Sequence, residues 1–304
     1  MKKKTTAKRI LLALLVVVLA ALAVYAVVFF RYLPHYRGEK EPITVTPAGE
    51  NRMMSCNLRY ISPTDLGQRS WFRRADLIVT EIENQAPGII GFQEATPVHY
   101  DYLVEVLPQY DSVITYRDKS IAPEGCPIFY HKDRYTLVDK GSFWLSETPE
   151  VMSKDWGAAC YRVCSYVILT DNRSGEDFVV FNTHLDHVSD EARINGIAVV
   201  LDKIEDFGGL PAVIMGDLNA EEDSETYENV TRYFLDARYA AAETSDMNTF
   251  HGWGKDPEPC RIDYFMVSDA FTVDRYQVVD NLYDGIYGSD HRPIVMDVRI
   301  KGEA

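Results

Sequence analysis

Hydrophobic residues form one long run near the N-terminus and then recur in short blocks through the rest of the chain. The run from Ile10 to Phe30 contains 21 residues and no charge. As a helix rising about 1.5 Å per residue it would reach about 30 Å, enough to cross the hydrocarbon core of a bilayer. It has no polar face, which disfavours a buried core helix. We expect residues 10–30 to be a transmembrane helix, with a cleaved signal peptide as the alternative.

The segments on either side of this run predict a single-pass topology in the cell membrane. Residues 1–9 form a basic leader, which the positive-inside rule places in the cytoplasm, so the remainder would be extracytoplasmic. Residues 31–50 are polar with Pro and Gly, and we expect them to be a tether. No second linker, low-complexity segment or internal repeat follows. Residues 51–301 therefore form one predicted domain.

Within that domain, helical and strand-like blocks alternate. Apolar residues at helical spacing predict helices over residues 71–83, 99–107 and 189–207. Compact apolar runs predict strands near residues 53–58, 89–92, 110–116, 127–131, 134–145, 161–170, 177–182, 212–215, 261–267, 271–279 and 293–300. This alternation favours an α/β fold of two packed sheets flanked by helices, with a doubly wound parallel sheet as the alternative.

Composition and charge limit the possible partners of this domain. With 46% hydrophobic residues, the chain can bury a sizeable core. Seven of its 31 basic residues lie in residues 1–38, which contain no acid, so residues 39–304 carry a net charge of −22. Such an acidic surface disfavours tight nucleic-acid binding unless metal ions neutralise the contact. The five cysteines include no C-x-x-C pair, and we interpret most of them as buried apolar residues rather than a zinc site or disulfides.

Polar side chains stand where several apolar runs begin or end, which gives them a rigid mount with access to water. Each one has an ordinary alternative role as a turn or helix-cap residue. Together they offer carboxylate and amide oxygens, which Mg²⁺ and Mn²⁺ prefer, and imidazoles for proton transfer. The set therefore predicts metal-assisted hydrolysis of a phosphate ester. Its members are Asn57, Glu94, His184, Asp217, Asn219, Asp263, Asp290 and His291.

The segments that carry these residues resemble a known family. In chain order they are SCNLRY, FQEA, PIFYHKDRY, FNTHLDH, GDLN, RIDYFMVS and SDHRP. This set is similar to the endonuclease/exonuclease/phosphatase family of the deoxyribonuclease I-like superfamily, in a membrane-anchored bacterial form. The likeness covers about residues 51–300, and it implies a four-layer α/β/β/α sandwich with residues 51–301 as the catalytic domain.

The resemblance also implies roles for the matching positions. Glu94 would be the principal ligand of a Mg²⁺ ion, with Mn²⁺ as a possible substitute, and Asn57 and Asp290 would complete the metal site. The other positions would be catalytic: Asp217 and Asn219 beside the scissile phosphate, His291 oriented by Asp263 to activate water or stabilise the phosphorane, and His184 assisting the leaving group.

For several further residues, the sequence leaves two interpretations open. Glu124 precedes the PIFY strand and is either the acid partner of His184 on the substrate side or a loop residue. Arg162 would give a positive contact to the substrate phosphate, or serve structure alone. Asp186 and His187 follow His184 closely and are catalytic or solvated. His251 is interpreted as structural.

The sequence thus predicts a Mg²⁺-dependent hydrolase of phosphodiesters or phosphomonoesters, acting by in-line attack of water. The acidic body favours a phosphorylated small molecule or a lipid head group as substrate. An extracellular nuclease acting on DNA or RNA is the alternative, and a catalytically inactive binding module is a third possibility. We expect a monomer attached to the membrane by its N-terminal helix.

Overall fold

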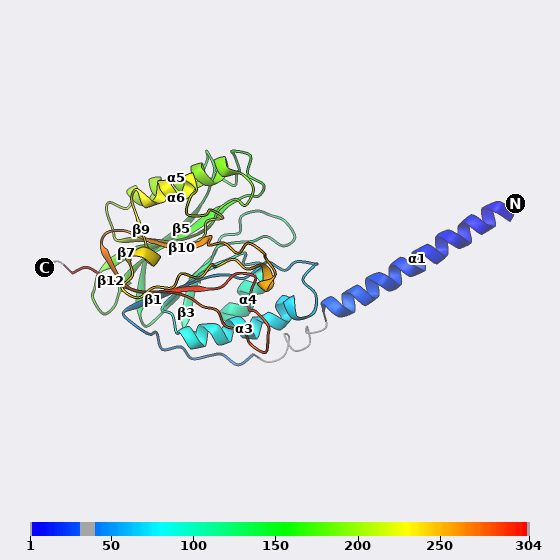
Figure 1. Cartoon of the computed structure of the whole chain (residues 1–304), viewed down its shortest axis with the longest axis horizontal. Coiled ribbons are helices and arrows are strands. Elements are labelled where there is room, and N and C mark those ends of the chain that lie inside the picture. Colours follow the sequence, from blue (N-terminus) through cyan, green and yellow to red (C-terminus); the bar gives the residue numbers. More distant parts are fainter. Residues whose placement is uncertain (1, 31–39, 303–304) are drawn as a thin grey trace.

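A long helix projects from one end of a layered body (Figure 1). This computed structural model describes residues 2–30 and 40–302, with side chains from residue 7 on. Helix α1 (Lys2–Phe29) contains the apolar stretch Ala7–Phe29, whose mean hydropathy reaches 3.1 and which is long and apolar enough to cross a membrane. The chain leaves the body at the opposite end, after strand β12 (Figure 1).

The body contains two six-stranded mixed sheets. The first has the order β11-β12-β1-β2-β4-β3, and the second has the order β5-β6-β7-β8-β10-β9. The strands of the first sheet are β1 (Asn51–Asn57), β2 (Ile89–Gln93), β3 (Tyr110–Val113), β4 (Ile128–His131), β11 (Phe271–Val278) and β12 (Ile294–Ile300). Those of the second are β5 (Tyr135–Trp144), β6 (Val163–Asp171), β7 (Asp177–His184), β8 (Ala212–Asp217), β9 (Leu235–Asp236) and β10 (Asp263–Val267).

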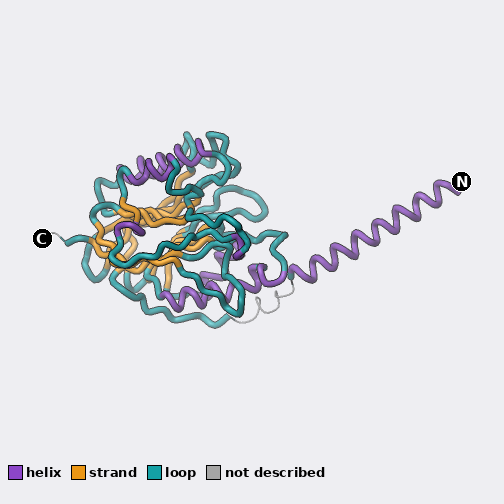
Figure 2. Tube along the Cα trace, in the orientation of Figure 1, coloured by secondary structure: helices purple, strands orange, loops and turns teal. Residues whose placement is uncertain are grey.

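Helices cover the outer faces of both sheets, so the body has four layers (Figure 2). Helices α3 (Trp71–Gln85) and α4 (Pro97–Val106) lie on the first sheet, and α5 (Asp190–Glu205) and α6 (Glu225–Thr231) lie on the second. Three buried clusters fill the spaces: one under α3 and α4, one between the sheets, and one under α5 and α6. The predicted α/β/β/α sandwich is confirmed, and the doubly wound alternative is not.

The helices begin and end where local chemistry favours it. Helix α3 buries Trp71, Phe72 and Ile78 on one face and ends at Ala86, which takes a left-handed conformation before Pro87. Helix α5 is capped by Ser189, whose side chain accepts a hydrogen bond from the Ala192 amide. The sequence analysis did not predict α6, β9, α7 (Ala237–Ala240) or the short 3₁₀ turns Gly67–Arg69 and Gly252–Gly254.

The strand directions bring the predicted site residues to one edge. β1 and β2 are parallel neighbours, as are β7 and β8, and these four strands end at Asn57, Gln93, His184 and Asp217. β10 runs antiparallel to β8, so its first residue, Asp263, lies directly opposite Asp217. Two sheets thus contribute to one site.

The segment before β1 packs onto the body. The Ile43 amide donates to Val106 O (3.0 Å), the Val45 amide donates to Gln109 Oε1 (2.7 Å), and Val45 is buried. Residues 43–48 therefore belong to the folded domain, although we expected residues 31–50 to be a tether. Residues 31–39 of that segment lie outside the described residues.

Candidate active site

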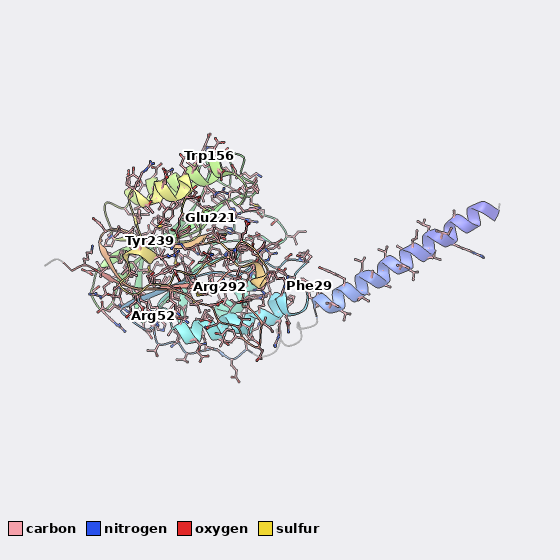
Figure 3. All side chains as sticks on the ribbon, viewed as in Figure 1. Phe29, Arg52, Trp156, Glu221, Tyr239 and Arg292 are labelled. Atoms are coloured by element: carbon pink, nitrogen blue, oxygen red, sulfur yellow. The ribbon has the colours of Figure 1, made fainter. Side chains whose placement is uncertain are left out.

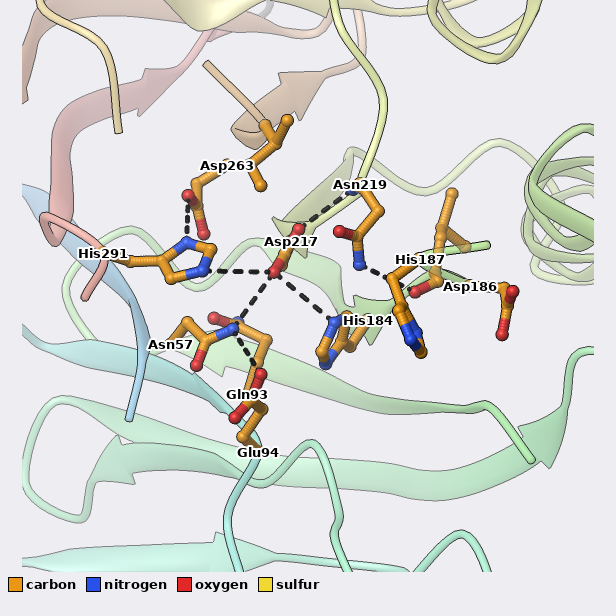
Figure 4. A network of polar contacts seen from close by, with 12 residues as sticks. Asn57, Gln93, Glu94, His184, Asp186, His187, Asp217, Asn219, Asp263 and His291 are labelled. Atoms are coloured by element: carbon orange, nitrogen blue, oxygen red, sulfur yellow. Dashed lines mark hydrogen bonds and ion pairs between the residues drawn. The ribbon is translucent and has the colours of Figure 1, made fainter. Parts of the chain in front are cut away.

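Asp217 lies at the centre of a polar network at the end of β8 (Figure 4). Its Oδ2 accepts a hydrogen bond from Asn57 Nδ2 (3.0 Å) and lies 3.4 Å from His184 Nε2 and 3.8 Å from His291 Nε2. Its Oδ1 accepts from the Asn219 amide (2.9 Å). Only 1% of Asp217 is exposed. Burial, followed by the charge of Asp263, raises its pKa to about 7.

A second carboxylate orients His291. The imidazole Nδ1 lies 2.9 Å from Asp263 Oδ2, and ligand atoms of Asp217, Asp263 and His291 all lie within 4.8 Å of one another. Burial opposes protonation of His291, but the charge and hydrogen bond of Asp263, with the charges of Asp217 and Asp290, outweigh it and raise its pKa to about 10. The other ring nitrogen is left facing Asp217.

Glu94 follows β2 and is held in an unusual conformation. Its φ angle is +57°, which non-glycine residues rarely adopt and which is characteristic of functional sites. Its Oε2 accepts from the Tyr60 amide (2.6 Å) and its Oε1 accepts from Asn57 Nδ2 (3.3 Å). The Asn57 Oδ1 faces the Arg59 amide, from which it accepts a hydrogen bond (2.9 Å). Asn57 therefore presents its NH₂ group to Glu94 and Asp217.

Asp290 lies on the same side of the site, next to His291. Its Oδ1 accepts from Ser289 Oγ (3.3 Å), and its Oδ2 lies 3.5 Å from Arg59 Nη1. Both Asp290 and Glu94 line the same cavity. Arg59, which the sequence analysis missed, reaches both the cavity and Asp290, and its position two residues after Asn57 was the available signal.

His184 occupies the opposite side of Asp217. Burial, then the nearby charges of Arg162 and Arg117, holds its pKa well below the usual value. Asn219, also with a positive φ of +48°, donates from Nδ2 to Leu185 O (3.0 Å) and so fixes the loop after His184. His184 is thus a neutral imidazole beside a carboxylate.

Two arginines, Arg162 and Arg117, line the cavity beyond His184. Arg162 is 5% exposed, its Nη2 lies 3.0 Å from His187 Nδ1, and its Nε lies 3.7 Å from Asp186 Oδ2 in an ion pair. Arg117 Nη2 donates to Glu124 Oε1 (2.7 Å). Burial raises the pKa of Glu124 to about 7, although Arg117 opposes the shift.

The contacts of Glu124 and Asp186 differ from those that the sequence suggested. Glu124 pairs with Arg117 instead of His184, because the Arg117 amide donates to Glu124 O (2.8 Å) and so brings the two residues together. Asp186 accepts from four backbone amides, at Ala159, Cys160, Val188 and Ser189, which fits a loop-organising role. Both acids still lie within the group of side chains around the site.

These side chains surround a cavity of about 870 Å³. The predicted residues at its surface are Glu94, Glu124, Arg162, His184, Asn219, Asp290 and His291. Asn57, Asp217 and Asp263 lie directly behind them in the hydrogen-bond network. The cavity is also lined by Tyr60, Arg117 and Arg193, which the sequence analysis did not single out. All ten predicted site residues are therefore brought together.

His251 has structural contacts, and three of the five cysteines are buried. His251 accepts from the Gly254 amide (2.8 Å), packs against Tyr287 and has its pKa lowered to about 4, mainly by burial. The five cysteines are free thiols among the described residues. Both observations agree with the sequence interpretation.

The layered fold, with acids and imidazoles around one cavity, defines a class of phosphate-ester hydrolases. The model of the endonuclease/exonuclease/phosphatase family matches residues 54–291. The chain belongs to this family, whose members are phosphoesterases and nucleases and typically depend on divalent metals. The predicted family resemblance is confirmed, and membership supports a hydrolase acting on phosphoric ester bonds.

Solved structures agree with this placement. An endonuclease/exonuclease/phosphatase from Bacteroides vulgatus is 32% identical, with a TM-score of 0.79 over 83% of this chain and 99% of the other. A mannosyl-6-phosphatase from Bacteroides thetaiotaomicron is 30% identical, with a TM-score of 0.75 over 82% of this chain and all of that chain. Nocturnin from Drosophila melanogaster is 29% identical over 181 residues, which cover 53% of this chain but only 26% of that protein.

Proposed function

We propose that this chain hydrolyses phosphate esters by in-line attack of water, with a divalent cation as cofactor. The observation that carries the proposal is the position of Asp217, which is buried within 4 Å of two imidazoles with opposite pKa shifts. Pairs of titratable groups whose environments separate their pKa values are characteristic of acid–base catalysis.

The donors present fit Mg²⁺ or Mn²⁺. Glu94 and Asp290 bring carboxylate oxygens to one cavity, and these hard cations prefer oxygen ligands. A bound cation would neutralise charge on the phosphoryl oxygens and on the clustered acids. We assign Glu94 as the principal ligand, with Asp290 in the same site. Asn57 supports this site by holding Glu94 and Asp217 through its NH₂ group.

Asp217 and His291 would handle the attacking water. The Asp217 carboxylate lies directly behind the cavity surface, between His184 and His291, and its raised pKa suits it to accept a proton near neutral pH. His291, held in place by Asp263, would place its positive charge next to the negative charge that develops on the phosphoryl oxygens. Asn219 would hold Asp217 in place through its amide.

His184 would act as a neutral hydrogen-bond donor to the leaving oxygen. Its lowered pKa leaves it uncharged near pH 7, so it would polarise the leaving group through a hydrogen bond, and the departing oxygen would take its proton from solvent water. Arg162, which lines the cavity beyond it, would bind an anionic group of the substrate. Glu124, which accepts a hydrogen bond from Arg117, would adjust the positive charge that this wall of the cavity offers to the substrate.

The size and charge of the site favour a small phosphorylated molecule or a lipid head group over a polynucleotide. The cavity of about 870 Å³ would hold a compact ligand, and the net charge of −22 on residues 39–304 opposes a phosphate backbone. The similarity to a mannosyl-6-phosphatase supports the same choice. A nuclease remains the competing activity, because the family also contains nucleases.

The anchor belongs to the same proposal. We propose that residues 10–30 span the cell membrane as a single pass, with residues 1–9 in the cytoplasm and the catalytic domain, residues 51–301, outside. The length and hydropathy of α1 support this topology.

A substrate panel tests the activity. The full chain would be assayed with and without Mg²⁺ on mannose 6-phosphate, inositol phosphates, sphingomyelin, bis-p-nitrophenyl phosphate, RNA and single-stranded DNA. We expect Mg²⁺-dependent turnover of a small or lipid ester, lost in Glu94→Ala and His291→Ala. Faster cleavage of RNA or DNA would favour the nuclease. Activity retained in either variant or in EDTA would overturn the mechanism.

A further inference from the structure

Helix α1 ends in contact with the catalytic body. Phe29 is only 9% exposed and lies where α1 meets the body (Figure 3). Its ring packs edge-on against Phe72 of α3 at 6.0 Å, and Phe30 packs on the same ring at 5.8 Å. Ser70 Oγ donates to Phe29 O (3.5 Å). The C-terminal end of α1 therefore packs against the catalytic body, in addition to being joined to it through the chain.

A second contact lies one helical turn deeper. The Tyr25 hydroxyl donates to the Pro63 carbonyl, and the Tyr25 ring stacks on Phe29 at 6.0 Å. The stretch Ala7–Phe29 has 23 residues and would span about 34 Å, slightly more than a hydrocarbon core of about 30 Å. Tyrosines at the end of such a span lie at the level of the lipid head groups. The segment around Pro63 would lie at that level.

The same segment leads directly into the active-site cavity. Arg59 and Tyr60 line the cavity, and Pro63 follows Tyr60 by three residues. Three residues span at most about 11 Å, so the rim of the cavity lies within that distance of the contact with Tyr25. Leu66, which is 37% exposed, adds an apolar side chain to the surface of the same segment.

The charge of this segment differs from that of the rest of the body. Residues 59–74 contain four arginines and a single acid, Asp65, within a body of net charge −22. Arg74 is fully buried and Arg59 pairs with Asp65 and Asp290, so the half-buried Arg69 and Arg73 carry the positive charge nearest the surface. Arg59 faces the cavity, and the half-buried Arg69 stacks on Trp253 at 5.5 Å. Two half-buried arginines beside an apolar contact suit a surface of phosphate head groups.

We propose that α1 holds the rim of the cavity against the bilayer, and that the substrate is the phosphate ester of a lipid head group in the adjoining leaflet. The inference deepens the proposed function and rests on it. Seating the enzyme on the membrane that contains its substrate raises the effective concentration of that substrate, without requiring a larger binding site.

Tryptophan quenching tests the orientation without reference to any substrate. Leu66→Trp places a reporter on the segment next to the anchor. Val138→Trp is the matched control, because Val138 is exposed and lies on β5 six residues before Trp144, at the strand end away from the site. In vesicles with brominated acyl chains, we expect quenching beyond that of the wild type for Leu66→Trp and none for Val138→Trp. Equal quenching of the two variants would overturn the proposed orientation.

Substrate selectivity tests the lipid class. The reconstituted full chain would be compared on sphingomyelin, phosphatidic acid and phosphatidylinositol 4-phosphate in the same vesicles, and on glycerophosphocholine, glycerol 3-phosphate and inositol 4-phosphate in solution. At least one lipid should be hydrolysed about tenfold faster than its soluble counterpart at equal bulk concentration, as expected from co-localisation. Lipids hydrolysed no faster than their soluble counterparts would overturn the inference.

A variant with a weakened contact between α1 and the catalytic body provides the final comparison. Tyr25→Phe combined with Phe30→Ala removes the Pro63 contact and one face of the Phe72 packing, and leaves the core ring of Phe29 in place. The lipid rate should fall about tenfold while hydrolysis of bis-p-nitrophenyl phosphate stays within twofold. Equal losses on both substrates would overturn the inference. Wild type inactive on every ester would overturn the proposed function instead, and the quenching contrast would still decide the orientation.

Discussion

Two histidines flank Asp217, and their surroundings make them chemically different. His291 receives a hydrogen-bonding carboxylate, Asp263, at 2.9 Å, which favours the imidazolium. His184 is buried and faces the charges of Arg162 and Arg117, which favour the neutral ring. A single carboxylate is therefore poised between a charged and an uncharged imidazole, and the roles proposed for the two rings follow from their neighbours.

Asp263→Asn tests the coupling between Asp263 and His291. The amide keeps nearly the same shape, but it loses the charge that raises the pKa of His291. We expect kcat to fall about 10²–10³-fold, the usual range for losing one group that stabilises charge in the transition state. The matched control is Asp274→Asn, which breaks an exposed ion pair between Asp274 on β11 and Arg299 on β12 and should leave kcat unchanged. Steady-state kinetics that show similar small effects for both variants would contradict the role of Asp263.

Glu124 gives a pH prediction with a defined sign. Its pKa is raised from 4.5 to about 7, chiefly by burial, so it is neutral below pH 7 and anionic above. Ionisation adds a negative charge beside Arg117 and should weaken binding of an anionic substrate. We expect KM to rise severalfold as pH increases through 7, and Glu124→Gln to remove this step. Profiles of kcat and KM from pH 5.5 to 8.5 check it, and an unchanged step in the variant would contradict it.

The same shift has a consequence for stability. A carboxyl whose folded pKa lies above its unfolded value contributes stability below about pH 4.5, and loses that contribution as pH rises through about 7. Glu124→Gln should therefore raise Tm at pH 8 relative to the wild type. Thermal unfolding at pH 4.5 and pH 8 measures the difference.

At the scale of single residues, the sequence identified the members of the site better than their contacts. All ten predicted residues converge, because six of them stand at or next to the end of a strand whose apolar character is visible in the sequence, and the other four lie in the adjoining loops. The partner of Glu124 was not predictable from the sequence. It depends on the backbone hydrogen bond that brings Arg117 next to Glu124. The direction of the Asn57 amide likewise depends on the backbone of Arg59.

Helix α3 joins the segment that follows Asn57 to the segment that precedes His291. Its Arg74 is fully buried and donates from Nη1 to Leu58 O (2.9 Å) and Gly288 O (2.6 Å), and from Nη2 to Arg59 O (3.2 Å). One guanidinium thus holds the loop after β1 against the loop before His291. Lysine has no comparable planar set of donors, so it cannot bridge these carbonyls.

We predict that Arg74→Lys lowers both stability and activity. Leaving these buried carbonyls unpaired should cost about 3 kcal/mol, which corresponds to a fall in Tm of about 6–12 °C for a domain of this size. We expect kcat to fall at least about tenfold at temperatures where the variant is folded, because Asn57 and His291 would shift. Arg73→Lys, on the neighbouring half-buried position of α3, is the control. Thermal unfolding and kinetics of both variants decide whether Arg74 acts in this way.

Gly216 sets the distance between the strands that carry His184 and Asp217. Its φ angle is +134°, and a Cβ there would lie 2.0 Å from Thr183 O on β7. Gly216→Ala should separate β7 from β8, lower Tm by more than 10 °C and abolish activity. Gly175→Ala is the matched control, because Gly175 also has a positive φ (+78°) but no atom within 4 Å of the added Cβ. It should cost only about 1 kcal/mol, and equal effects would contradict the steric argument.

At the scale of elements, long and strongly patterned segments were predictable and short ones were not. The strands IIGF and AVIMG lie at the centres of their sheets, where both faces are buried, so their apolar runs are unambiguous. Helices α6 and α7 have seven and four residues and give no clear periodicity. They depend on side-chain caps from Ser224 and Asp236, which resemble ordinary turn residues in sequence.

The whole molecule is strongly acidic, and its folding gathers part of that charge at one cavity. Glu94, Asp217, Asp263 and Asp290 converge there, opposed on the far wall by Arg162 and Arg117. Grouping acids in a buried site destabilises the folded state unless a cation offsets the repulsion. The sequence showed the excess of acid, but only the packing of the two sheets shows where it concentrates.

Metal binding should therefore stabilise the full chain measurably. A ligand at 100 times its Kd adds about 2.7 kcal/mol, or about 5–11 °C in Tm for a domain of this size. We expect Mg²⁺ or Mn²⁺ to produce such a rise and EDTA to reverse it, with activity lost in parallel. Glu94→Gln should abolish the rise while raising Tm without metal, because one repelling charge is removed. Glu83→Gln, at an exposed position on α3, should retain the full metal response. A rise in Tm that survives Glu94→Gln would place the cation elsewhere and contradict the proposed metal site.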